Sequence, residues 1–177
     1  MRYVLLKHEK DNDFHVDFLL DCGQECLLTW QMTDHVFIDR LKSNGIFLNF
    51  AESPNRTNDT FYSNCHRIFD HRRKYLDFSG DIGDSRGRVV CMDNGEWELC
   101  EICAQHLIIK TIGVFSVDNS PITRIWRFEP PIGITLDTDG TSPDRLMQHL
   151  PPPDDENWVV SCTQMFCADL KIGKPLK

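Results

Sequence analysis

Two histidines and an aspartate near the start of the chain have the residue types and the spacing of a metal site. His15-Val16-Asp17 lies in an alternating polar and apolar segment, and residues i and i+2 of a β-strand point to the same face. His8 ends the preceding apolar run, and the intervening turn is expected to fold it back beside His15. Imidazole and carboxylate ligands together suit Mn²⁺, Fe²⁺ or Zn²⁺. From spacing alone, a pair of surface histidines beside an ordinary acid remains the alternative.

The segments around these residues predict a meander of three antiparallel strands, over 3–8, 15–21 and 26–31, followed by a helix over 33–43. Thr33 or Asp34 is the expected N-cap of this helix and Gly45 its stop. A polar loop is expected over 51–60, a hairpin turn at 93–95, and a short helix starting at 142–144. Further strands are expected over 46–50, 73–78, 88–92, 97–109, 112–117, 122–128 and 158–162. Many short strands with two minor helices indicate a mainly-β barrel or sandwich.

The composition is that of one globular domain spanning residues 1–177. A net charge of −8 argues against a broadly basic nucleic-acid coat. No apolar run approaches the roughly 18 residues of a membrane span, and the N-terminal apolar stretch is too short for a signal peptide. We therefore expect a cytoplasmic protein that does not enter a membrane.

One segment of the chain is locally basic. Residues 67–88 hold six basic and four acidic side chains, a local charge of +2. The basic residues are Arg67, Arg72, Arg73, Lys74, Arg86 and Arg88. This segment is either an ordinary solvated face or a patch that faces phosphate.

Eight cysteines are present, and in the expected compartment they should be mostly reduced thiols. The spacing Cys100-x-x-Cys103-x-x-His106 could supply half of a zinc site. A second such cysteine pair is absent from the sequence, so we expect buried thiols and no structural zinc at Cys100 and Cys103. A redox or nucleophilic role and a zinc-stabilised module are the weaker alternatives.

Several short motifs, in order, resemble the 3′-phosphoesterase domain of bacterial ATP-dependent DNA ligases of the LigD type. They are Lys7-His8, His15-Val16-Asp17-Phe18, Thr29-Trp30, Asp70-His71 and the segment 75–80, so the resemblance covers roughly residues 2–97. The family implies a β-barrel and a Mn²⁺-dependent activity that processes 3′-ribonucleotide and 3′-phosphate ends. It also implies nucleic-acid 3′ ends and DNA-repair proteins as partners.

Residue by residue, His8, His15 and Asp17 match the metal ligands of this family. His71 matches a second histidine that acts on the phosphate or the leaving group, and Tyr75 matches a tyrosine of the same motif. The resemblance therefore implies catalytic roles for His71 and Tyr75 and a Mn²⁺ site at the first three residues.

The chain departs from the family where phosphate should bind. Leu19 stands in place of an arginine, Asp34 near a lysine position, and Phe69 in place of a glutamate. Other cations must then hold phosphate. We expect Arg73 and Arg86 to bind phosphate ahead of Arg72 and Arg88. An extended segment would put Arg73 on the face of His71, and the glycine-rich turn over 80–87 carries Arg86. The alternative is a non-catalytic member of the fold that serves as a metal-binding or interaction module.

Overall fold

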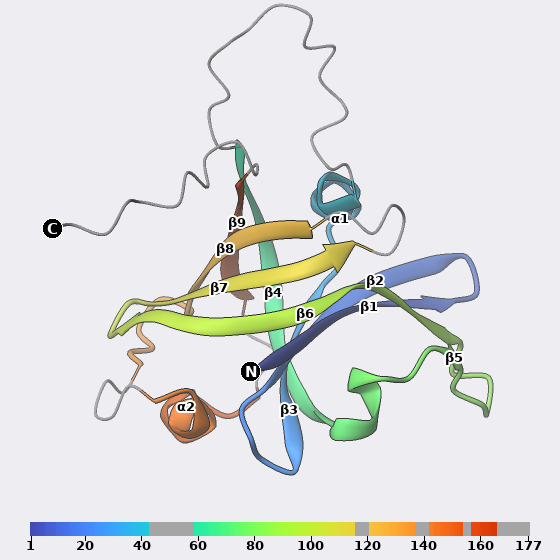
Figure 1. Ribbon diagram of the computed structural model, residues 1–177, viewed down its shortest axis with the longest axis horizontal. Coiled ribbons are helices and arrows are strands. Elements are labelled where there is room, and N and C mark those ends of the chain that lie inside the picture. Colours follow the sequence, from blue (N-terminus) through green and yellow to red (C-terminus); the bar gives the residue numbers. More distant parts are fainter. Residues whose placement is uncertain (43–58, 116–120, 137–141, 154–156, 166–177) are drawn as a thin grey trace, which may run out of the picture.

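The chain folds mainly into β-strands, which form one antiparallel sheet (Figure 1). The computed structural model describes residues 1–42, 59–115, 121–136, 142–153 and 157–165. The strands are β1 (Arg2–Lys10), β2 (Asp13–Asp21), β3 (Cys26–Met32), β4 (Asp59–Arg72), β5 (Gly80–Asp81), β6 (Arg88–Cys103), β7 (His106–Phe115), β8 (Pro121–Glu129) and β9 (Asn157–Met165). The helices are α1 (His35–Lys42) and α2 (Leu146–His149), and two 3₁₀ turns are η1 (Arg73–Leu76) and η2 (Pro143–Arg145).

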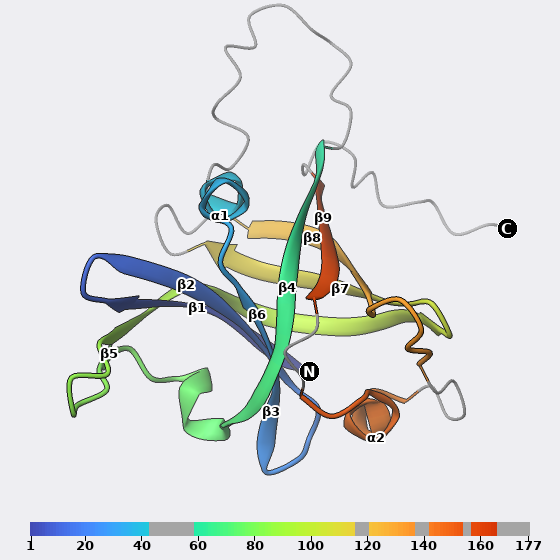
Figure 2. The same cartoon turned by 180° about the vertical axis from the view of Figure 1, so that it is seen from behind.

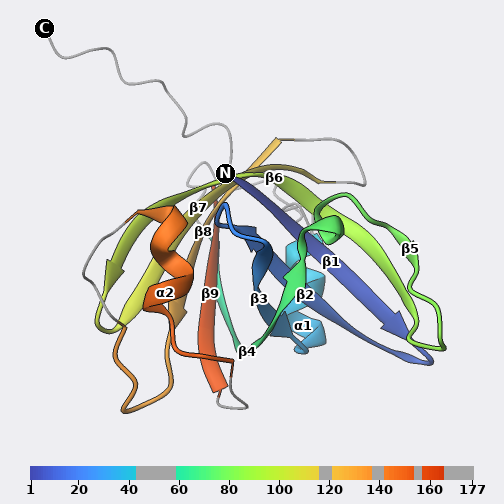
Figure 3. The same ribbon diagram turned by 90° about the horizontal axis from the view of Figure 1, so that it is seen from below.

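The nine strands are hydrogen-bonded in the order β1-β2-β3-β4-β9-β8-β7-β6-β5, and β1 also pairs with β6. This second pairing returns the sheet to its first strand, so that the hydrogen bonding forms a ring from which β5 projects. Figure 3 shows the strands curving around a common interior. The expected mainly-β, antiparallel architecture is confirmed.

Alternation along the strands separates a large inner cluster from the outer face. On β2, Val16, Phe18 and Leu20 are fully buried in that cluster. The indole of Trp30 on β3 stacks on Phe128 with ring centroids 4.4 Å apart. Full burial of each of these large apolar side chains contributes on the order of 1.5–3 kcal/mol to stability. The remaining alternate positions of β1 and β2 face outward and carry the candidate site.

The two α-helices lie at opposite ends of the sheet (Figures 1 and 2). The carboxylate of Asp34 accepts hydrogen bonds from the backbone N–H groups of Val36 and Phe37, at 2.9 and 3.2 Å, and so caps α1 as expected. Phe37, Ile38 and Leu41 give α1 its buried face. At the other end, Pro143 begins the η2 turn that leads into α2, also as expected.

The strand boundaries in the middle of the chain differ from those expected. Residues 93–95 form no hairpin turn, because β6 runs through them and pairs with β1 on one side and β7 on the other. The carboxylate of Asp93 is fully buried, accepts a hydrogen bond from the Tyr3 hydroxyl at 2.8 Å, and forms an ion pair with Arg124. A buried, paired aspartate outweighs the local turn preference of Asp-Asn-Gly.

The expected strand over 73–78 is also wrong, since β4 ends at Arg72 and residues 73–76 form the 3₁₀ turn η1. Most of β4 lies in a segment where the residue pattern predicts no strand. The expected strand over 97–109 divides at residues 104–105, where β6 turns into β7. The predictions for 46–50 and Gly45, and most of the expected 51–60 loop, lie outside the described residues, although Asp59 and Thr60 belong to β4.

Candidate metal centre

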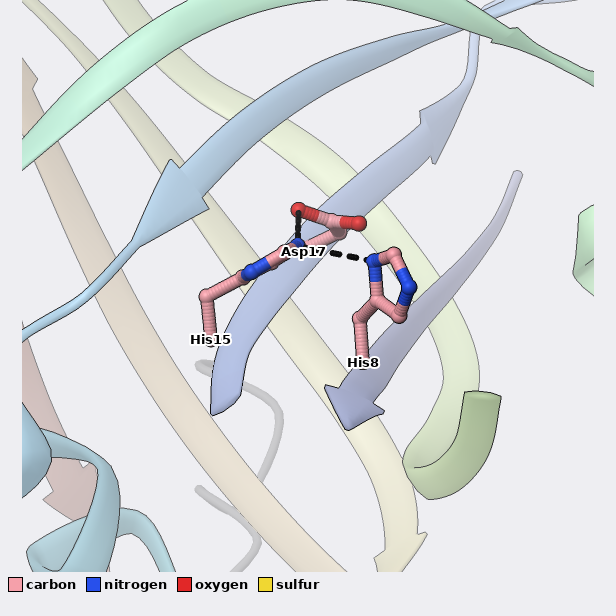
Figure 4. Close-up of side chains that lie close together, drawn as sticks. All are labelled: His8, His15 and Asp17. Carbon is pink, nitrogen blue, oxygen red and sulfur yellow. Dashed lines mark hydrogen bonds and ion pairs between the residues drawn. The ribbon is translucent and has the colours of Figure 1, made fainter. Parts of the chain in front are cut away.

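Adjacent strands bring His8 and His15 together, as the sequence predicts. They are directly paired across β1 and β2, and Asp17 lies two residues further along β2. His8 Nδ1 is 3.1 Å from His15 Nε2, and His15 Nε2 is 3.6 Å from Asp17 Oδ1. Figure 4 shows the three side chains pointing toward one another. All three offer a ligand atom within 4.8 Å of the others.

The three donors lie on the outer face of the sheet, partly shielded by a second hydrophobic cluster. That cluster consists of Val4, Leu6, Leu19, Leu27 and Leu76, with Tyr75 and Cys91 packed against it. Asp17 is only 3% exposed, and its Oδ1 atom has no hydrogen-bond partner among the described residues. Desolvating a carboxylate oxygen without a partner costs free energy, and a bound cation would remove that cost. The donor set and this orphaned oxygen both fit a divalent transition metal.

The ring of His8 is held by the glycine-rich turn that follows β5. His8 Nε2 lies 2.7 Å from the backbone carbonyl oxygen of Arg86. A carbonyl can only accept, so His8 donates from Nε2, and in the neutral ring Nδ1 keeps its lone pair toward His15 and Asp17. Metal-binding histidines commonly have this arrangement, in which the second nitrogen donates to a carbonyl. No sequence motif signals this contact, because a backbone group supplies it.

His71 joins the site from the end of β4. Its Nε2 atom is 3.7 Å from Asp17 Oδ2, on the other oxygen of the same carboxylate. Its Nδ1 atom donates to the carbonyl oxygen of Phe69 at 3.1 Å, which leaves Nε2 as the nitrogen that faces Asp17. The ring of Tyr75 packs edge-on against His71 with centroids 5.5 Å apart. The structure therefore brings His71 and Tyr75 close to the three donors.

The four arginines expected to bind phosphate are arranged differently. Arg73 opens the η1 turn, so the extended geometry that put it beside His71 is absent, and its guanidinium forms a bidentate ion pair with Asp21 at 2.6 and 2.7 Å. The side chain of Arg86 donates to the carbonyls of Ile82 and Gly83 in its own turn. Arg72 and Arg88 are exposed. Within the described residues, none of these four guanidinium groups forms a hydrogen bond or ion pair with the three donors or with His71.

The three departures from the family pattern have separate structural roles. Leu19 is fully buried in the second hydrophobic cluster, where an arginine could not keep its charge solvated. Asp34 caps α1 and so serves the fold. Phe69 is 82% exposed and acts on His71 through its backbone carbonyl, which any residue could provide. Arg67, counted in the basic segment, is buried and pairs with Asp70 at 2.7 Å, so that segment is not one continuous charged surface.

We expect Gly87→Ala to weaken metal binding by about 10- to 100-fold, the usual effect of losing a contact that orients a ligand. Gly87 has φ +97°, and an added Cβ would lie 2.1 Å from the carbonyl oxygen of Glu9. The turn would have to withdraw from β1 and take the Arg86 carbonyl away from His8. Isothermal titration of the apoprotein with Mn²⁺ measures the change.

The matched control is Gly83→Ala in the same turn. Gly83 also has a positive φ, +72°, but no atom lies within 4 Å of the position that an added Cβ would take. This variant carries similar backbone strain without the clash, and its Mn²⁺ affinity should stay within about threefold of the wild type. Equal weakening by both variants would show that strain in the turn, and not the His8 contact, controls affinity.

The described residues contain two groups of three potential metal ligands, His8/His15/Asp17 and Glu101/Cys103/His106. No protein-family model matches the chain, and no curated protein matches it in sequence. Among the helices that the structure describes, none is long and apolar enough to cross a membrane.

Proposed function

We propose that the chain is a metal-dependent phosphoesterase on a closed antiparallel β-barrel, related to the 3′-phosphoesterase domain that processes 3′-ribonucleotide and 3′-phosphate ends. One observation carries the proposal. The buried carboxylate of Asp17 has His15 Nε2 at 3.6 Å from Oδ1 and His71 Nε2 at 3.7 Å from Oδ2, while His8 Nδ1 lies 3.1 Å from His15 Nε2. A metal site with a separate histidine a few ångströms away is an arrangement that suits phosphate-ester hydrolysis.

His8 Nδ1, His15 Nε2 and Asp17 Oδ1 would hold a Mn²⁺-class ion. When bound, such an ion neutralises a phosphoryl oxygen and lowers the pKa of a bound water. The protein's own contribution is to keep the His8 ring oriented through the Arg86 carbonyl and to place His15 Nε2 3.6 Å from Asp17 Oδ1.

His71 is the proposed proton donor to the leaving 3′ oxygen. Its Nδ1–H is fixed by the Phe69 carbonyl, so the exchangeable proton is carried on Nε2. The Asp17 carboxylate faces this nitrogen, and Tyr75 restricts the rotation of the ring by packing against it. Hydrolysis adds water to phosphorus as the 3′ oxygen leaves with this proton.

A second candidate is a metal-binding module without catalysis, and the arrangement of the arginine side chains favours it. Arg73 is committed to Asp21, and Leu19 occupies the position of the family arginine. In this alternative the metal site persists and phosphate is not turned over.

We expect the Mn²⁺-loaded protein to release phosphate from a 3′-phosphorylated primer-template, and His71→Ala to lower turnover by about 10²- to 10⁴-fold. Mn²⁺ affinity should change little, because His71 is outside the three donors. The assay measures released phosphate and bound Mn²⁺ on the same preparations.

The matched control is His66→Ala, on the same strand β4. The side chain of His66 forms no hydrogen bond or ion pair with the described residues, so this variant should keep wild-type turnover. Mn²⁺ binding without phosphate release by the wild type would select the non-catalytic module. Failure to bind Mn²⁺ would reject both candidates.

A further inference from the structure

The tip of the β6–β7 hairpin gathers three different metal-binding side chains. Cys103 and His106 are paired across the two strands, separated only by the two-residue turn Ala104-Gln105. Glu101 lies two residues before Cys103 on β6. Strand alternation therefore directs Glu101 and Cys103 to one face, and the cross-strand pairing adds His106 to it.

The three groups are in direct contact. Cys103 Sγ is 3.2 Å from His106 Nδ1 and 3.6 Å from Nε2, and His106 Nε2 is 3.1 Å from Glu101 Oε1. One thiol, one imidazole and one carboxylate thus offer ligand atoms within 4.8 Å of one another. Cys103 and His106 are half-buried, while Glu101 is exposed and leaves the site open to solvent.

This arrangement repeats that of His8, His15 and Asp17. In both hairpins a cross-strand pair near the turn is joined by an acidic residue two positions along one strand. The two hairpin tips lie at opposite sides of the molecule (Figures 1 and 3), so the two groups cannot share one ion. The difference is chemical, since a thiol replaces one imidazole.

We propose that Glu101, Cys103 and His106 form a second metal site, selective for Zn²⁺ over Mn²⁺. A thiolate is a softer ligand than imidazole or carboxylate and favours Zn²⁺. Tetrahedral Zn²⁺, with bonds of about 2.0 Å to nitrogen and 2.3 Å to sulfur, separates its ligand atoms by about 3.3–3.5 Å. The separations of His106 Nε2 from Glu101 Oε1 and Cys103 Sγ, 3.1 and 3.6 Å, lie close to these values. The fourth position is open to water or to a ligand from a partner.

The proposed site does not use the Cys100–Cys103 pair that the sequence spacing indicates. On a strand, residues three apart point to opposite faces, and the register of β6 also shifts between Leu99 and Glu101. Cys100 is exposed and is not one of the three grouped donors. The proposal thus departs from the expectation of buried thiols without zinc at these two positions, since Cys100 is exposed and Cys103 would bind the ion.

Co²⁺ is the probe that tests the proposal, because a thiolate bound to Co²⁺ gives a near-ultraviolet charge-transfer band and tetrahedral Co²⁺ gives strong visible bands. Titrating the reduced, metal-free full chain with Co²⁺ should produce both bands at one equivalent, and one equivalent of Zn²⁺ should remove them. Cys103→Ser should lose the charge-transfer band completely, and His106→Ala should lose the tetrahedral visible bands.

Cys100→Ser is the matched control, a neighbouring exposed cysteine on the same strand, and should keep both bands. Asp17→Asn should also keep them, which separates this site from the one at the β1–β2 hairpin. Circular dichroism checks that each variant is folded. Absence of the bands in the wild type, their survival in Cys103→Ser, or their loss in Cys100→Ser would each overturn the proposal.

Discussion

Asp17→Asn should abolish both Mn²⁺ binding and phosphate release, with a loss of metal affinity greater than about 100-fold. Asp17 supplies the only carboxylate among the three donors, and an amide oxygen carries no charge to offset a divalent ion. Loss of a direct ligand should exceed the 10- to 100-fold cost of losing a contact that only orients a ligand. Titration calorimetry and the phosphate-release assay, on the same sample, measure both losses.

Asp13→Asn is the matched control for this experiment. Asp13 lies on β2 two residues before His15, and its exposed carboxylate forms an ion pair with His35, at 3.3 Å. Exposed pairs of this kind contribute about 0–1 kcal/mol, so the variant should bind Mn²⁺ and release phosphate normally. Unchanged Mn²⁺ affinity in Asp17→Asn would place the ion elsewhere and would reject the proposed centre.

Arg124→Ala should destabilise the fold by about 3–5 kcal/mol, the usual result of breaking a buried ion pair from one side. Arg124 and Asp93 are both fully buried, and the guanidinium also donates to the carbonyl of Leu41 at 3.2 Å. Removing Arg124 leaves the Asp93 carboxylate buried beside the Tyr3 hydroxyl, a partner that carries no compensating charge. Urea unfolding monitored by tryptophan fluorescence gives the change in the free energy of unfolding.

Arg127→Ala is the control on the same strand, β8. Arg127 pairs with Glu129 at 2.6 Å, and both side chains are about two-fifths exposed, at 40% and 44%. This variant should lose no more than about 1 kcal/mol. A similar loss of unfolding free energy in both variants would show that burial does not determine how much these ion pairs contribute to stability.

The loss of folding stability in Arg124→Ala should also depend on pH. Burial raises the pKa of Asp93 in the wild type, and Arg124 opposes that rise. Without Arg124 the pKa rises further, so the folded variant keeps a proton that the unfolded chain releases above about pH 4. Its stability relative to the wild type should therefore fall as the pH is raised from about 5 to about 8. A deficit that is constant over this range would contradict a buried, unpaired carboxylate as its cause.

The sequence predicts the site best where the signal is local. His8, His15 and Asp17 follow from a single hairpin and strand alternation, and the cap of α1 follows from Asp34. His71 is expected near these residues only because it matches a histidine of the 3′-phosphoesterase pattern, since no spacing rule links residues so far apart.

The failures have a common physical cause, which is tertiary structure outweighing a local preference. Asp93-Asn94-Gly95 has the residues of a turn, yet distant Tyr3 and Arg124 hold Asp93 inside the sheet. The C-x-x-C spacing suits a metal site on a turn, whereas on β6 the residues two apart, Glu101 and Cys103, share a face. Alternation predicts Arg73 on the face of His71, but the chain leaves the strand one residue earlier.

The pairing of β1 with β6 has a consequence for the order in which the site can assemble. The three metal donors need only the β1–β2 hairpin, whose short connection has a low loop-closure entropy. The Arg86 carbonyl lies beside His8 where β1 pairs with β6, at Glu9 and Arg88, and this pairing joins residues far apart in the chain, which form contacts slowly. During synthesis from the N-terminus, the three candidate ligands are thus available before the carbonyl that orients His8, and closure of the ring of strands would complete the proposed centre.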